Sequence, residues 1–260
     1  MADVSYQTVK VRFQDSICFA QIDRPEANNT INGRLVAELT DVLIKCEESA
    51  TAVVLSGSPE VFCFGADFAA ISDGTDDASL RKDNEGPGPL YDLWLRMSGG
   101  PYVTISHVRG KVNAGGVGFV AASDIVLADE TAQFSLSELL FGLYPACVLP
   151  FLIRRVGFQR AHYLTLMTQP IAAKQAFEWG LVDAFDAQGD ALLRRHLQRL
   201  RRLSKVAIRR YKNYMSTLHQ SLSNLKSPAV AANLEVFSDP ENMAAVARYV
   251  KQGVFPWEKI

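Results

Sequence analysis

The chain lacks the features that mark secreted, membrane-bound or metal-binding proteins. Its cysteines, Cys18, Cys46, Cys63 and Cys147, are widely separated, with no Cys-x-x-Cys pair and no histidine at ligand spacing. Neither a zinc site nor a disulfide framework is therefore expected, and the thiols are interpreted as buried or incidental. No apolar run approaches the roughly 20 residues of a membrane span, and the N-terminus lacks a signal-peptide pattern. These absences predict a cytoplasmic protein with no membrane partner and no metal.

An excess of charge of either sign, internal repeats and low-complexity segments are also missing. The 260 residues are 48% apolar and 21% charged, with a formal net charge of −1. This composition is ordinary for a soluble enzyme and is sufficient to bury a full core. We expect a core domain over residues 1–190 that contains the active site, and a helical region over residues 191–260.

Strand and helix patterns alternate through the first two thirds of the chain, which favours an α/β layered domain. The predicted elements are a hairpin over residues 6–23, a helix over 35–44, strands over 51–57 and 103–110, a helix opening at Gly115 and Gly116, and a strand over 124–128. Residues 71–89 are polar and contain Gly and Pro, as expected of a loop over a site. Beyond residue 190 the pattern is helical, with a predicted break near Ser227 and Pro228.

Two glycine-bearing turns and one carboxylate suggest acyl-thioester chemistry. A thioester enolate develops negative charge on oxygen, and two backbone N–H groups aimed at one point stabilise it without reorganisation. Gly65 with Ala66, and Gly115 with Gly116, are candidates for these donors because glycine permits close approach of the backbone. A helix that starts near Gly116 would add its positive dipole end. An isolated Gly pair is more often only a turn. The interpretation as an oxyanion hole therefore depends on the order in which the two turns, the strands and Glu138 occur along the chain.

That order resembles the crotonase, or enoyl-CoA hydratase/isomerase, superfamily over roughly residues 6–260. The resemblance rests on residues 24–32 (RPEANNTIN), 62–67 (FCFGAD), 113–118 (NAGGVG), 132–138 (AQFSLSE) and 176–182 (AFEWGLV). It implies a repeated ββα spiral with a C-terminal helical region that mediates formation of a trimer, or of a hexamer as a dimer of trimers.

The resemblance also implies roles for individual residues. Ala66 and Gly115 fall where the family places its two oxyanion-hole N–H donors, and Glu138 falls at the second of two catalytic acidic positions. The segments expected to bind the coenzyme A or pantetheine portion of the substrate contain Arg24, Ala27, Phe64, Ala66, Asp67 and Gly116. No cofactor is implied, since the acyl group arrives on the phosphopantetheine of an acyl carrier protein or on coenzyme A.

Two departures from the family pattern bear on the reaction. Gly118 occupies the first acidic position, and addition of water to an isolated double bond is usually assigned to two carboxylates. Dehydration or isomerisation by Glu138 alone is therefore favoured over ordinary hydration. A solvated or capping glutamate at the start of a helix is the alternative, because Ser135-x-x-Glu138 fits a capping box. Residues 146–150 (ACVLP) replace a glycine-rich turn, and either a reshaped acyl pocket or core packing explains them.

Three segments most resemble the enoyl-CoA hydratase homologues of polyketide β-branching cassettes, of the single-glutamate dehydratase type. They are residues 100–116, 135–155 and 255–258. The implied reaction converts 3-hydroxy-3-methylglutaryl-ACP to 3-methylglutaconyl-ACP. An enoyl-CoA isomerase of the β-oxidation type and a non-catalytic homologue that binds acyl thioesters remain as alternatives.

A basic run over residues 194–212 is the candidate docking surface for an acidic carrier protein. Arg201, Arg202, Arg209 and Arg210 are its candidate contacts. A solvated helix face, or contacts with coenzyme A phosphates, explains the run equally well. Nucleic-acid binding is not expected, since only Tyr211 and Tyr214 interleave with the basic residues.

A glutaryl substrate has a distal carboxylate that requires a cation or several hydrogen-bond donors. Candidates are His107, Lys111, Arg81, Lys82, Tyr91 and Tyr144. Spacing does not choose among them, and the role stays unassigned.

Overall fold

The computed structural model describes residues 5–72, 86–218 and 221–258. Within these residues, six strands form one sheet in the order β1-β2-β3-β5-β7-β10, and four form a second in the order β4-β6-β8-β9. The strands are β1 (Val9–Gln14), β2 (Ile17–Ile22), β3 (Ala52–Ser56), β4 (Val61–Cys63), β5 (Val103–Val108), β6 (Lys111–Asn113), β7 (Ile125–Ala128), β8 (Gln133–Ser135), β9 (Ile171–Ala172) and β10 (Ala184–Phe185). Neighbouring strands are parallel except in the pairs β1–β2 and β8–β9.

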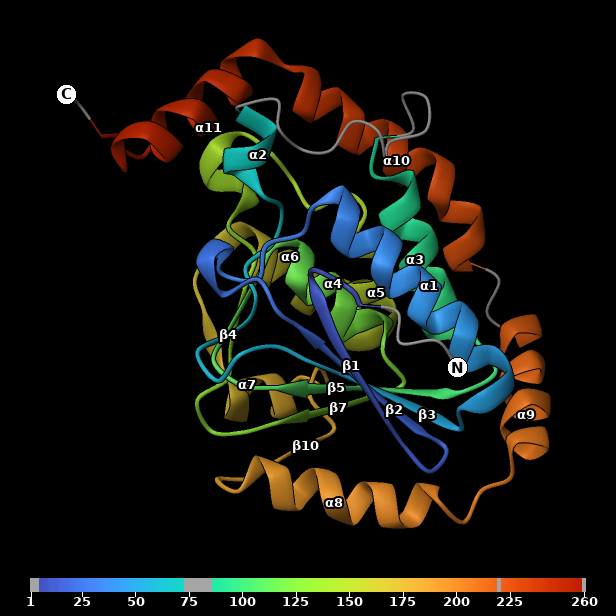
Figure 1. The fold of residues 1–260 in the computed structure, drawn as a ribbon. Coiled ribbons are helices and arrows are strands. Elements are labelled where there is room, and N and C mark those ends of the chain that lie inside the picture. The colour runs from blue at the N-terminus through green and yellow to red at the C-terminus, as the bar shows by residue number, and fades with distance from the viewer. Residues whose placement is uncertain (1–4, 73–85, 219–220, 259–260) are drawn as a thin grey trace.

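Helices surround the two sheets (Figure 1). They are η1 (Pro25–Ala27), α1 (Gly33–Ser49), α2 (Phe68–Ser72), α3 (Gly88–Gly99), α4 (Gly115–Ala122), η2 (Glu138–Phe141), α5 (Leu149–Val156), α6 (Phe158–Met167), α7 (Ala173–Glu178), α8 (Gly189–Leu200), α9 (Lys205–Leu218), α10 (Ser221–Ser238) and α11 (Pro240–Gln252).

From β3 to β8, consecutive strands alternate between the two sheets, which generates the spiral. The pairs β3 and β4, β5 and β6, and β7 and β8 each place their first strand in the larger sheet and their second in the smaller one. Helices α2 and α3 follow the first pair and α4 follows the second. The predicted α/β class and crotonase-like ββα spiral are therefore confirmed.

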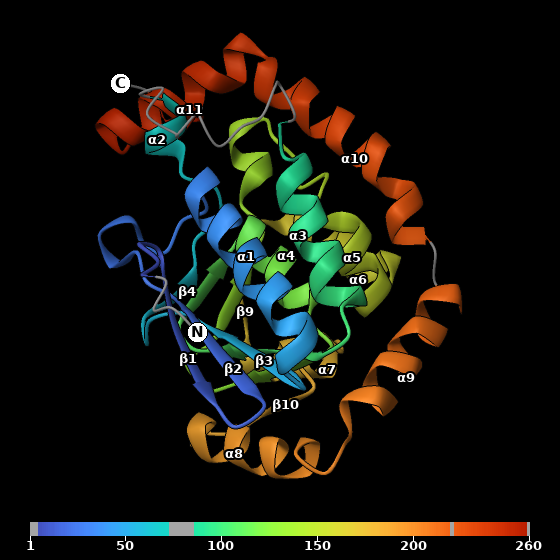
Figure 2. The same ribbon diagram turned by 45° about the vertical axis from the view of Figure 1, so that its right-hand side comes forward.

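The larger sheet is buried on both faces, which explains why its central strands read as nearly continuous apolar runs. One face packs on the main core under α1, α3 and α4. The other face packs Val54, Ile105 and Leu127 against Leu193 and Leu197 of α8. Figures 1 and 2 show α8 alone on that side of the strands. Every predicted strand and helix of this part is present, including the hairpin and the helix within α1.

The C-terminal helices wrap around the core. Helices α9 and α10 follow one side of it, and α11 lies over α2 (Figure 2). The predicted break near Ser227 and Pro228 is wrong, because Pro228 lies inside α10. A proline removes one helical hydrogen bond, but packing of Leu222 and Ala229 into the core and a hydrogen bond from Tyr91 Oη to the Leu222 carbonyl hold the helix in place.

Two expectations about organisation are not tested. The division of the chain at residue 190 stays a prediction. Most of the expected loop over residues 71–89 lies outside the described residues, as do Arg81 and Lys82. Among the helices of the described segments, none is long and apolar enough to cross a membrane.

Candidate active site

The two glycine-bearing turns lie against each other. Gly65 has a φ of +92°, and a Cβ on it would lie 2.6 Å from Cβ of Ala114 and 3.4 Å from the Gly115 nitrogen. A Cβ on Gly116 would lie 2.3 Å from the Cys63 carbonyl oxygen. Glycine is required at both positions, because any side chain would push the turn after β4 away from the start of α4.

The backbone N–H of Ala66 is directed away from the neighbouring segment. Ala66 forms an isolated parallel bridge with Ile31. The bridge uses the flanking groups: Ile31 N donates to the Gly65 carbonyl (2.7 Å), and Asp67 N donates to the Ile31 carbonyl (3.0 Å). Since neighbouring N–H groups in an extended segment point to opposite sides, the bridge leaves the Ala66 N–H available to a ligand.

The N–H of Gly115 is available for a different reason. Gly115 is the first residue of α4, and the first N–H groups of a helix have no acceptor within it. The preceding Ala114 has a φ of +51°, a conformation that costs energy for a residue other than glycine. A hydrogen bond from Ala114 N to the Ser135 carbonyl (3.0 Å) fixes this turn. Two available donors on touching turns are what an oxyanion hole needs, and that role stays a prediction.

Glu138 is the first residue of η2, directly beyond β8. The pairing of β6 with β8 brings the start of η2 beside the start of α4. Side chains reinforce the connection: Asn113 Nδ2 donates to Ser137 Oγ, and Ser135 Oγ donates to Asn113 Oδ1, both at 2.8 Å. Residue 138 therefore starts an element that lies next to the turn before α4.

Glu138 is buried and its pKa is raised, and its role as an acid–base group stays a prediction. The residue is 8% exposed, and its Oε2 atom is buried without a hydrogen-bond partner. Burial raises the pKa of Glu138 to about 7, although the backbone N–H groups of residues 137 and 138 act in the opposite direction. A buried carboxyl with a strongly raised pKa is typical of functional sites.

The capping-box alternative for Glu138 is wrong. The N-cap of η2 is Ser137, which makes no side-chain cap. Ser135 belongs to β8, and its hydroxyl is bonded to Asn113. A solvated glutamate is also excluded, because the residue is buried.

Arg24 and Asp67, both expected to contact pantetheine, form an ion pair with each other. Arg24 Nη2 lies 2.8 Å from Asp67 Oδ2, and Arg24 Nη1 donates to the Thr30 carbonyl. The pair fastens the loop after β2 to the turn that contains Ala66. Phe64 is exposed and Ala27 is partly exposed. Contact of these residues, and of Gly116, with a pantetheine arm stays a prediction.

Three candidates for the distal carboxylate are engaged or placed elsewhere. Tyr91 is buried and donates its hydroxyl to the Leu222 carbonyl. His107 is buried next to Gly189, at the start of α8. Lys111 is at the far end of β6 from Asn113 and is exposed. Tyr144, which packs beside a cluster around Phe141, is the candidate nearest to η2.

Sequence reasoning missed the way α11 covers η2. Val246 and Phe141 are buried together, and the Tyr249 ring lies 5.1 Å from the Phe141 ring. Asn242 Nδ2 donates to the Gly142 carbonyl at the end of η2 (3.2 Å). These contacts cover η2 with α11. The helical period of residues 240–252 indicated a helix but not its partner.

The basic run is not one free patch. Lys212 is buried against Asp124, and Arg201 and Arg209 face Asp15 (3.3 Å) and Glu48 (3.9 Å). Acidic residues from other elements thus compensate part of the charge that seemed unopposed along the sequence. Arg202 and Arg210 are exposed, and within the described segments neither is in an ion pair.

Comparison with known proteins places the chain in a family. The family model for enoyl-CoA hydratase/isomerase matches residues 12–259. Over 256 residues, 98% of each chain, the protein is 61% identical to bacillaene synthase dehydratase PksH of Bacillus subtilis. It is 28% identical over 85% of its length to a probable enoyl-CoA hydratase of Rhodobacter capsulatus, of which it covers 84%.

Solved structures agree. A Bacillus subtilis crystal structure described as a polyketide biosynthesis enoyl-CoA hydratase superposes with a TM-score of 0.92 at 61% identity, covering 97% of this chain and 100% of that one. An enoyl-CoA hydratase from Bacillus halodurans shares the fold, with a TM-score of 0.83 at 19% identity over 92% of this chain and 99% of that one. These matches confirm the predicted likeness to polyketide-biosynthesis members and the predicted enzyme class, a hydro-lyase. The chain belongs to the enoyl-CoA hydratase/isomerase family.

Proposed function

We propose that the protein dehydrates 3-hydroxy-3-methylglutaryl-ACP to 3-methylglutaconyl-ACP during β-branching of a polyketide. The observation that carries the proposal is Glu138, a buried carboxyl with an unpartnered oxygen beside two turns with available N–H groups. The 61% identity with a dehydratase over nearly the whole chain supports the direction of the reaction.

The proposed reaction uses two backbone N–H donors and one carboxyl group. The N–H groups of Ala66 and Gly115 polarise the thioester carbonyl, which acidifies C2. Glu138 takes a proton from C2, and the electron pair of that C–H bond forms the enolate. The enolate electron pair then forms the C2–C3 double bond as the C3–O bond breaks. Glu138 gives the proton to the departing hydroxyl, which leaves as water. A carboxyl with a pKa of about 7 suits both transfers near neutral pH.

The proposal predicts a loss of one water from the acyl carrier protein substrate. Intact-protein mass spectrometry of 3-hydroxy-3-methylglutaryl-ACP, incubated with the enzyme, is expected to show a product lighter by one water. The Glu138→Gln variant should give none, and the Glu130→Gln variant, altered at an exposed glutamate, should match wild type.

The alternatives are outcomes of the same experiment. An unchanged substrate mass with wild-type enzyme would contradict the proposal, and an assay for 3-enoyl-CoA isomerisation would then decide between an isomerase and a non-catalytic homologue.

We also propose that Arg202 and Arg210 guide the acidic carrier protein to the site. Reversal of both charges, by Arg202→Glu with Arg210→Glu, is expected to raise KM for acyl-ACP at least about tenfold at low salt, since steering by surface charge is strong there. KM for the same acyl group on pantetheine should not change. Steady-state kinetics with both substrates tests this.

Lys10→Glu with Lys174→Glu provides the matched control, because it reverses two exposed charges outside the basic run. An equal effect of the two double variants on acyl-ACP, or an equal effect of the arginine variant on both substrates, would contradict a docking role.

A further inference from the structure

The place of the missing first carboxylate is filled by a tryptophan. Gly118 lies one turn beyond Gly115 in α4. A Cβ on Gly118 would lie 2.3 Å from Cζ2, 2.4 Å from Cη2 and 2.7 Å from Cε2 of Trp94. The indole ring of Trp94 on α3 therefore occupies the space into which any side chain at residue 118 would extend.

The indole nitrogen of Trp94 has no hydrogen-bond partner. Trp94 is 1% exposed, and its Nε1 atom is buried and unpaired. Cε2, which lies close to Gly118, is bonded to Nε1, so the unpaired N–H lies beside the first turn of α4. Leaving such a donor unpaired costs about 1–3 kcal/mol, and exceptions of this kind call for a functional explanation.

The ring is held rigidly. Trp94 packs edge to face with Phe119 at 5.9 Å and with Phe151 at 5.7 Å between ring centroids. Two neighbouring elements, α4 and α5, thus fix the direction of the N–H. A donor with a fixed direction needs no reorganisation when charge develops on its acceptor.

Unpaired buried atoms are few. Among the described residues they are Trp94 Nε1, His107 Nε2, Glu138 Oε2 and Arg248 Nε. His107 belongs to β5 and lies beside Gly189 at the start of α8, and Arg248 donates to the Phe255 carbonyl. The other two, one donor and one acceptor, belong to the elements around the starts of α4 and η2.

We propose that Trp94 is a catalytic residue whose indole N–H donates a hydrogen bond to the C3 hydroxyl oxygen of the substrate as the C3–O bond breaks. This inference rests on the proposed dehydratase function. The oxygen gains negative charge as it leaves, which strengthens a hydrogen bond from a fixed donor. An indole N–H does not ionise at neutral pH, so Trp94 donates a hydrogen bond without giving up its proton. Glu138 then carries both proton transfers, and the site favours elimination without a second base to activate water.

The kinetic test is Trp94→Phe, which retains an aromatic ring and removes the N–H. It is expected to lower kcat for dehydration about 10- to 100-fold, the range for loss of one hydrogen bond to a charged group. Deuterium wash-in at C2 from D2O, which requires only the oxyanion hole and Glu138, should persist. The ratio of wash-in to elimination therefore rises at least about tenfold. Phe151→Leu, which loosens the ring without removing the N–H, should raise the ratio by less than Trp94→Phe does.

A direct measurement covers the case in which Trp94→Phe does not fold. The chain has three tryptophans, so indole N–H resonances of the 15N-labelled Glu138→Gln protein are readily resolved. Binding of 3-hydroxy-3-methylglutaryl-pantetheine should move the Trp94 resonance downfield, whereas 3-methylglutaryl-pantetheine, which lacks the hydroxyl, should not.

Equal NMR shifts with the two ligands, or an unchanged ratio in Trp94→Phe, would overturn the role of Trp94. Neither result would affect the proposed dehydration, which wild-type turnover measures separately. Absence of turnover by wild type would instead remove the proposed function.

Discussion

Replacing Glu138 by Gln is expected to lower kcat for dehydration by about 100- to 10,000-fold, the contribution usual for general acid–base catalysis. The amide has the shape of the carboxyl group but cannot accept the C2 proton. Because Glu138 Oε2 has no partner in the folded protein, the substitution breaks no hydrogen bond at that atom. The fold should persist, which circular dichroism and the thermal midpoint would verify beside the kinetics.

The same residue sets the pH dependence. Burial raises the pKa of Glu138 to about 7 from the ordinary 4.5, and only the ionised form can act as the base. We therefore expect kcat/KM of wild type to be level above about pH 7 and to fall as pH decreases through that value. The residual activity of Glu138→Gln should lack this break. A Glu138→Gln rate within tenfold of wild type would contradict the assignment.

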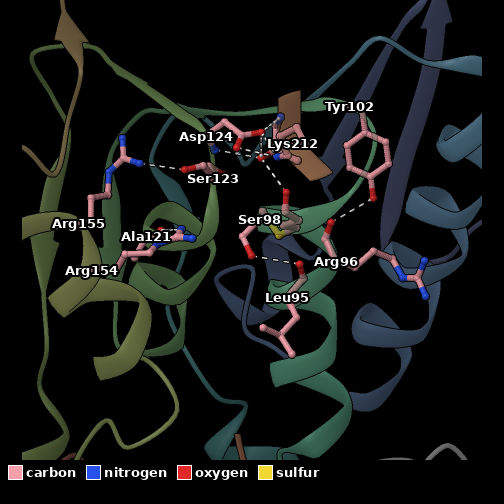
Figure 3. Close-up of polar contacts among 12 residues, drawn as sticks. Leu95, Arg96, Ser98, Tyr102, Ala121, Ser123, Asp124, Arg154, Arg155 and Lys212 are labelled. Carbon is pink, nitrogen blue, oxygen red and sulfur yellow. Dashed lines mark hydrogen bonds and ion pairs between the residues drawn. The ribbon is translucent and has the colours of Figure 1, made fainter. Parts of the chain in front are cut away.

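Replacing Lys212 by Ala is expected to lower the free energy of unfolding by about 3 kcal/mol. Lys212 is 6% exposed, and its Nζ lies 2.7 Å from Oδ1 and 2.5 Å from Oδ2 of Asp124 (Figure 3). The lysine is buried and Asp124 is partly exposed. Removing one partner of a fully buried ion pair leaves the other charge uncompensated, which costs about 3–5 kcal/mol. The lower end applies because the Asp124 side chain is 26% exposed.

The contact also joins distant parts of the chain. Asp124 precedes β7 and accepts hydrogen bonds from the backbone N–H (2.8 Å) and the hydroxyl (3.1 Å) of Thr104 in β5, so Lys212 fastens α9 to the larger sheet. Figure 3 shows Arg155 beside this position, donating to the Ser123 carbonyl.

Urea unfolding would measure the effect of Lys212→Ala. Arg210→Ala, at an exposed position of the same helix, should change stability by less than about 0.5 kcal/mol. The double variant Lys212→Met with Asp124→Asn should recover part of the loss, because it leaves no buried charge. Equal stability of Lys212→Ala and wild type would show that the pair does not stabilise the fold.

Local pattern was sufficient to predict most elements. These elements depend on residues that are close together in the sequence. Examples are the apolar spacing within α1, the Asn32 side chain that accepts a hydrogen bond from Leu35 N at its start (2.9 Å), and the apolar runs of β3 and β5. Local pattern also misled: Ser135-x-x-Glu138 has the letters of a capping box, but Ser135 ends a strand whose register with β6 turns its hydroxyl to Asn113.

The remaining features depend on contacts across the fold. Lys212 contacts Asp124, which is 88 residues away in the sequence, and Trp94 contacts Gly118, which is 24 residues away. The spacing of residues along a helix or strand does not predict contacts between such distant residues. From the sequence, Lys212 was therefore interpreted as one more cation of the basic run. No sequence pattern set Trp94 apart from other apolar residues. The sequence pointed to Glu138 through family resemblance, whereas its raised pKa depends on a tertiary environment assembled from β8, η2 and the elements around them.

The contact between Trp94 and Gly118 also restricts which pairs of residues can occupy the two positions together. A single change of Gly118 to Glu would drive the new side chain into the indole ring. A single change of Trp94 to a small residue would leave a cavity that costs about 3–5 kcal/mol. Each single change is therefore expected to destabilise the fold, so a carboxylate at residue 118 requires a smaller residue at position 94 in the same molecule.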